Sequence, residues 1–136
     1  MTFVRSLRCA LAGLADVLRT QRHARFHALT TVAVAALGAW LRLPRESWLW
    51  LIAACGLVWT AEILNTAIEI LADRVTMQRD PLIGRAKDAA AGAVLVAALA
   101  AFAIGALVLG PPALAKIKAL RNDPAAPATA PAASVR

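Results

Sequence analysis

The chain has 136 residues, of which 60% are hydrophobic and only 5% are aromatic. An average soluble domain contains about 45–50% apolar residues even when glycine is counted, so this composition excludes an ordinary small soluble protein and favours a membrane protein. The formal net charge of +7 would also suit a nucleic-acid-binding protein, and the placement of the charges has to decide between the two classes.

The first segment predicts an amphipathic helix over residues 4–24. Leucines recur along it at spacings of four, three and four, which places them on one helical face: Leu7, Leu11, Leu14 and Leu18. The first 25 residues also hold five arginines and no apolar run long enough for a secretory signal, so we expect no cleavage. Such a helix suits the membrane interface, where cations meet anionic headgroups. A soluble cap packed on the rest of the chain is the alternative.

Three segments without formal charge follow, each bounded by a short charged segment. A membrane-spanning helix needs about 20 mostly apolar residues. We therefore predict three transmembrane helices, at residues 27–43, 47–72 and 86–109. The middle one reaches this length only if Glu62, Asn65 and Glu69 lie inside the helix.

Lysine and arginine counts predict the orientation of these spans. The N-terminal segment has five such residues and the loop after the second span has four, so both are expected on the cytoplasmic side. Tryptophans flank the turn at Pro44, as in an interfacial belt on the outer side: Trp40, Trp48 and Trp50.

After Gly110 the sequence continues with two prolines, and we expect the domain to cover 1–110 and an Ala/Pro-rich disordered tail to cover 111–136.

Four polar residues form one stripe on the second predicted span. Glu62, Asn65, Glu69 and Asp73 fall within about 80° of one another at 100° per residue. An ionised side chain near the bilayer centre costs about 2.5–3.5 kcal/mol on insertion scales, so such residues usually mark a functional site. Polar contacts between helices, or a proton or ion pathway, are the alternatives. A pathway needs polar groups through the full membrane thickness, whereas the outer half of this span carries no charge.

The loop opposite the stripe carries cations at the start of the third span. Arg79, Arg85 and Lys87 lie where the free amides and the dipole of a helix N-terminus already favour anions such as phosphate. Carboxylates for a metal ion, a candidate base and phosphate-binding cations are the groups that phosphoryl transfer requires. The sequence has no Walker loop and no protein-kinase signature. A nucleotide site would therefore be built from these helices.

These motifs resemble the bacterial diacylglycerol kinase / undecaprenol kinase family over about residues 6–110. The resemblance rests on Glu62-Ile-Leu-Asn65-Thr-Ala-Ile-Glu69, on Asp73 and on Gly84-Arg85-Ala-Lys87-Asp88. It implies an all-α integral membrane helical bundle in the bacterial cytoplasmic (inner) membrane, homotrimeric, with active sites shared between neighbours. It also implies Mg²⁺-dependent transfer of phosphate from ATP to a lipid hydroxyl at the cytoplasmic face. Diacylglycerol and undecaprenol both remain open as the acceptor.

The resemblance also implies roles for single residues. Glu62 would be the general base, Asn65 would orient groups beside it, and Glu62 and Ala91 would contact the lipid. Glu69 would be a Mg²⁺ ligand. A second metal-binding glutamate of the family is replaced here by Gln21, whose amide oxygen can coordinate a cation but brings no charge. The ATP contacts implied by the family are Asp73, Gln78, Arg79, Asp80, Lys87 and Asp88.

Histidines and cysteines add little to this prediction. His23 and His27 have a spacing that could bind Zn²⁺ on a helix, but no third ligand is evident, and we expect His27 to form a hydrogen bond at the membrane entry instead. Cys9 and Cys55 lie far apart without metal-type spacing, so free thiols are expected. Two classes of function remain: a lipid kinase, and a non-catalytic membrane oligomer or proton or ion pathway.

Overall fold

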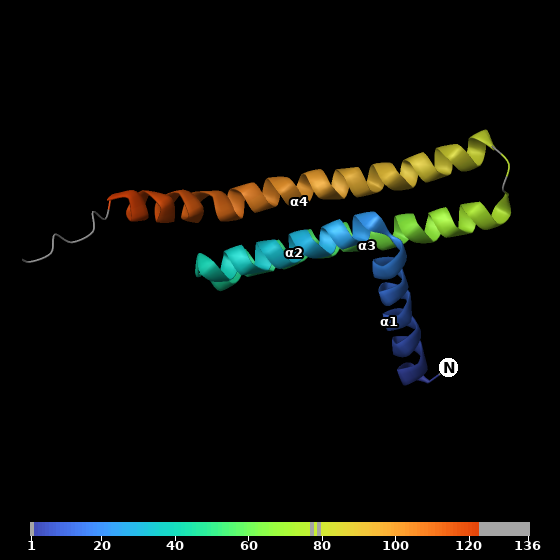
Figure 1. Ribbon diagram of the computed structural model, residues 1–136, viewed down its shortest axis with the longest axis horizontal. Helices are drawn as coiled ribbons and strands as arrows, with labels where there is room; N and C mark the ends of the chain where they lie inside the picture. Colours follow the sequence, from blue (N-terminus) through green and yellow to red (C-terminus); the bar gives the residue numbers. More distant parts are fainter. Residues whose placement is uncertain (1, 77, 79, 123–136) are drawn as a thin grey trace, which may run out of the picture.

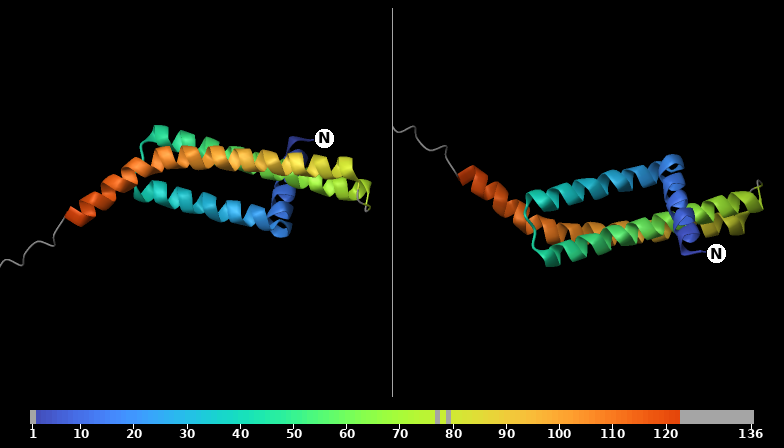
Figure 2. Two further views of the ribbon diagram at one scale, coloured as in Figure 1. Left: turned by 90° about the horizontal axis from the view of Figure 1, so that it is seen from above. Right: turned by 90° about the horizontal axis from the view of Figure 1, so that it is seen from below.

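The computed structural model describes residues 2–76, 78 and 80–122, and it arranges them as four α-helices (Figure 1). In chain order these are α1 (Phe3–Thr20), α2 (Arg22–Trp40), α3 (Arg45–Val75) and α4 (Pro81–Asn122). α3 and α4 form a long antiparallel hairpin, and α2 packs along α3 (Figures 1 and 2). The described residues form no strand, so the all-α prediction is confirmed.

α1 crosses the direction of the other helices (Figure 1). The chain changes direction at Gln21, whose extended backbone (φ −95°, ψ 122°) ends α1 and precedes α2. The prediction of one helix over 4–24 is therefore wrong at its C-terminal end. No proline or glycine marks the break, so local sequence does not show it. The four leucines on the apolar face of α1 are 37–57% exposed, so the described chain does not cover this face as a soluble cap would require.

The first span is predicted to reach residue 43, but the helix ends earlier and a turn connects it to α3. α2 ends at Trp40, and the Leu43 N–H donates to the Gly38 carbonyl oxygen at 3.1 Å, as in the Schellman motif. Arg42 adopts the left-handed conformation, with φ 54°, that this motif usually assigns to glycine. α3 then begins directly after Pro44.

The α3–α4 hairpin forms most of the core. α3 has 31 residues and α4 has 42, which correspond to about 46 and 63 Å of helix. The residues of α4 buried within the chain are Ala90 and Ala97, and such small side chains let two helices approach closely. α4 starts where Asp80 caps it: the Asp80 carboxylate accepts hydrogen bonds from the N–H groups of Leu82 (2.8 Å) and Ile83 (3.3 Å).

Two of the described helices, α3 and α4, are long and apolar enough to cross a membrane. They contain the predicted second and third spans. α2, which contains most of the predicted span 27–43, is not among them, because arginines, histidines and threonines in its first half lower its hydropathy. Three spans per chain therefore stays a prediction.

α4 continues beyond the predicted end of the domain. The helix runs through Pro111 and Pro112 to Asn122, so the prediction of disorder from residue 111 is wrong for 111–122, while residues 123–136 lie outside the described residues. Each proline removes one helical hydrogen bond, and Figure 2 shows α4 changing direction in this part. Lys116 holds the extension against α2: its ammonium group donates to the Trp40 carbonyl oxygen at 2.9 Å and lies 4.4 Å from the centre of the Trp40 ring.

Candidate active site

The polar stripe of α3 lies at one end of the bundle. α3 and α4 extend together past the start of α2 (Figure 1). Glu62 lies beside the beginning of α2, where His27 approaches it, and Asp73 is about 16 Å further along the helix. The stripe therefore runs from a buried position beside α2 to the exposed end of the hairpin.

Glu62 is the most enclosed carboxylate of the stripe, with only 3% of the residue exposed. His27 of α2 approaches it, with 4.0 Å between His27 Nε2 and Glu62 Oε2. A buried carboxylate suits a general base, because few water molecules form hydrogen bonds with it and compete with the proton that it accepts. The burial of Glu62 fits the role that the resemblance implies for it.

Asn65 and Glu69 form the second part of the stripe. The Asn65 Nδ2–H donates to Glu69 Oε1 at 3.0 Å. Asn65 Oδ1 is buried and has no hydrogen-bond partner among the described residues. A free amide oxygen beside a carboxylate is a donor set that Mg²⁺ accepts. The described residues contain no group of three His, Cys, Asp or Glu side chains that could hold a metal, so phosphate oxygens and water would have to complete the coordination.

Asp73 and Lys87 pair across the hairpin. The Lys87 ammonium donates to Asp73 Oδ1 at 2.8 Å, and both side chains are accessible to solvent. A surface pair of this kind adds little to stability. Its consequence is geometric, since it directs the ammonium of α4 toward the stripe on α3.

The other predicted site residues are not joined to the stripe by a side-chain hydrogen bond or ion pair in the described part of the chain. Gln21 lies half-buried at the break between α1 and α2, Asp80 caps α4, and Gln78, Asp88 and Ala91 are exposed. Arg79 lies outside the described residues. The roles assigned to these residues stay predictions.

An apolar groove, which the sequence did not reveal, lies between α2, α3 and α4. It has a volume of about 440 Å³, and His27, Thr30 and Thr31 supply most of its polar groups. At this level the Trp59 Nε1–H donates to Thr31 Oγ1 at 3.1 Å and ties α3 to α2. No local sequence pattern predicts the groove, because the alanine, valine and leucine residues that line it are also the residues expected on a lipid-facing surface.

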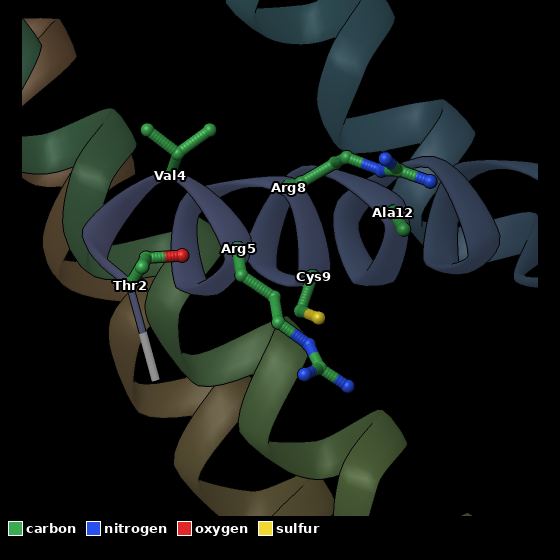
Figure 3. Close-up of a pocket in the computed structure, with 6 residues that line it drawn as sticks. All are labelled: Thr2, Val4, Arg5, Arg8, Cys9 and Ala12. Carbon is green, nitrogen blue, oxygen red and sulfur yellow. The ribbon is translucent and has the colours of Figure 1, made fainter.

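A second hollow, of about 570 Å³, lies along α1 and is lined by Arg5, Arg8 and Cys9 among others (Figure 3). None of the predicted site residues lines it. Its cations suit contact with headgroups, as expected of an interfacial helix. We therefore place the candidate active site at the stripe of α3 and not here.

Comparison with known proteins shows the family of the chain. Residues 8–109 match the family described as prokaryotic diacylglycerol kinase. The chain is 38% identical over 109 residues to an undecaprenol kinase of Bacillus subtilis, covering 80% of this chain and 89% of that one. It is 41% identical over 110 residues to a diacylglycerol kinase of Synechocystis, covering 80% of this chain and 63% of that one. It is 35% identical over 77 residues to a diacylglycerol kinase of Escherichia coli (strain K12), covering 57% of this chain and 63% of that one.

The chain thus spans less than two thirds of the two diacylglycerol kinases and most of the undecaprenol kinase. All the residues of the stripe, together with Lys87, lie within the matched segment. The chain belongs to the prokaryotic diacylglycerol kinase family, and the lipid kinase predicted from its motifs is confirmed at the level of that family.

Proposed function

We propose that this protein transfers the γ-phosphoryl group of ATP to the hydroxyl group of a membrane lipid. The observation that carries the proposal is a line of polar groups where α3 faces the start of α4. On α3 lie a buried carboxylate and an amide whose unpartnered oxygen is next to a second carboxylate, and at the open end an ammonium of α4 pairs with a third carboxylate. These groups follow one another over about 16 Å, which suits a lipid hydroxyl at one end and a polyphosphate at the other.

Glu62 is the proposed base that receives the proton of the lipid hydroxyl. The apolar groove begins beside it at His27 and continues between the helices toward Leu109, so a hydrocarbon chain in the groove would bring its polar end to this level. Diacylglycerol and undecaprenol share the required chemistry, a hydroxyl at the end of long hydrocarbon. The structure favours neither of them.

Glu69 and Asn65 are the proposed ligands of Mg²⁺, with Gln21 as a weaker candidate. Bound there with the nucleotide, the ion would neutralise phosphate charge. Lys87 stabilises the charge of the transferring group, and the nearby carboxylate of Asp73 keeps its ammonium in place. Asp88, Gln78, Arg79 and Asp80 are proposed to contact ATP around this end of the hairpin.

We further propose a homotrimer in the bacterial cytoplasmic membrane, with the stripe on the cytoplasmic side and sites shared between subunits. The unpartnered Asn65 Oδ1 supports a site that other groups complete. Many large apolar side chains of α3 and α4 are exposed in the single chain, as expected of helices that contact lipid or a neighbouring subunit. Light scattering of the purified protein with correction for bound detergent tests the trimer.

The kinase is tested with purified protein, γ-labelled ATP and Mg²⁺, with diacylglycerol and undecaprenol in separate reactions. We expect label in at least one lipid, and its loss with Glu62→Gln. Glu46→Gln is the matched control, because Glu46 lies in the first turn at the other end of the same helix. Absence of labelled lipid with the native chain, or equal labelling with Glu62→Gln, refutes the proposal and returns the stripe to the structural or ion-pathway alternatives.

A further inference from the structure

Three of the four polar residues of the α3 stripe have a hydrogen-bond partner. Asn65 donates to Glu69, and Lys87 donates to Asp73. Glu62, the most buried acid of the stripe, is left without either donor. Within the described part of the chain, His27 is the cationic or potentially cationic group that lies within 4.0 Å of a Glu62 carboxylate oxygen.

His27 also lines the apolar groove, whereas Glu62 does not. The imidazole therefore lies where the groove meets the carboxylate. Both side chains are enclosed, with 16% of the His27 side chain and 5% of the Glu62 side chain exposed. A buried carboxylate without a hydrogen-bond donor is costly, so a nearby N–H group stabilises it and selects its orientation.

We infer that His27 is a positioning residue for Glu62: its Nε2–H donates to the Glu62 carboxylate and directs the free oxygen of that carboxylate toward the end of the groove. The separation of 4.0 Å is longer than a hydrogen bond, which requires about 3 Å. Bonds within active sites are often long before the substrate is bound and shorten in the complex. The two side chains would have to approach by about 1 Å in the complex.

This inference rests on the proposed lipid kinase activity, and its test separates the donated hydrogen bond from the shape of the ring. His27→Gln keeps an N–H donor at similar reach, and His27→Met has a similar size without a donor. His23→Met is the matched control, because His23 is exposed one turn earlier on the same helix. For each variant, kcat and the KM values for ATP and lipid are measured.

We expect His27→Met to lower kcat about 100-fold with an unchanged KM for ATP, because a misdirected base loses rate and not nucleotide binding. His27→Gln should recover at least a tenth of the native kcat, and His23→Met should stay within twofold of native. Equal kcat for the native chain and His27→Met overturns the inference. So does a His27→Gln variant as slow as His27→Met, since ring shape would then be the requirement.

A second measurement does not depend on activity. Thermal unfolding of His27→Met, Glu62→Gln and the double variant in detergent reports whether the two side chains interact. We expect the loss in Tm of the double variant to be smaller than the sum of the two single losses. Additive losses overturn the contact even if the protein is an active kinase, and failure of the native chain to label lipid refutes the kinase alone.

Discussion

Replacing Asn65 by aspartate tests whether the centre of the stripe is a cation site. In the native chain the Asn65 amide donates to Glu69 Oε1 at 3.0 Å, and its own oxygen is buried without a partner. Asn65→Asp has almost the same shape. It replaces the amide NH₂ group, which donates to Glu69, by a carboxylate oxygen. Two carboxylates are then in contact at this place.

The size of the effect follows from this geometry. Two unit charges 3.0 Å apart repel by about 5.5 kcal/mol at an effective dielectric constant of 20. The pair can avoid this repulsion by taking up one proton, which costs a carboxyl group of ordinary pKa near 3.9 about 4 kcal/mol at pH 7 and about 1.5 kcal/mol at pH 5. The proton restores a donor between the two groups. Without metal, Asn65→Asp should therefore lose about 4 kcal/mol of stability at pH 7 and less than half of that at pH 5.

A divalent cation should reverse the loss, because it neutralises both carboxylates without a proton. Thermal unfolding of the native chain and of Asn65→Asp in detergent is measured with Mg²⁺ and with a chelator. The control variant is Gln78→Glu, which adds the same charge at an exposed position of the loop. We expect Mg²⁺ to raise the Tm of Asn65→Asp more than that of the native chain or of Gln78→Glu. The reasoning is refuted if Asn65→Asp is as stable as native in the chelator, or if Mg²⁺ raises the Tm of all three proteins equally.

Three further substitutions have expected outcomes. Lys87→Met should reduce phosphate transfer to lipid at least 100-fold, because it removes the ammonium that Asp73 holds near the stripe. Arg42→Gly should raise the free energy of unfolding by about 1 kcal/mol, because glycine adopts the left-handed conformation of this residue without strain. Gly38→Ala should lower it by about 1–3 kcal/mol, because a Cβ there would lie 3.1 Å from the Trp48 ring. Labelled ATP measures the first effect, and thermal unfolding measures the other two.

Each of these substitutions has a control in the same chain. Lys118→Met removes an exposed lysine at the other end of α4, and activity as low as that of Lys87→Met would show a general charge effect. Arg45→Gly changes an arginine that begins α3 in helical conformation, so a gain in stability there would contradict the account of Arg42. Gly56→Ala meets no atom within 4 Å, and a loss equal to that of Gly38→Ala would contradict the steric argument.

Local features of the sequence determined the helices and the stripe. Long segments without charge predicted α3 and α4, the Asp80-Pro81 pair marks the start of α4, and the spacing of Glu62, Asn65 and Glu69 places these side chains on one face. These features depend on hydrogen bonds and side chains within one or two helical turns. The same motifs carry the resemblance to the family, which depends on no contact between helices.

Contacts between helices were decided only by the tertiary structure. Periodicity shows which residues share a face of one helix, but it does not show which residue of the next helix lies opposite or at what level. The approach of His27 to Glu62 and the groove between three helices depend on that register. The continuation of α4 through Pro111 is accompanied by a distant contact as well, since Lys116 binds the end of α2 and holds a segment that its prolines weaken.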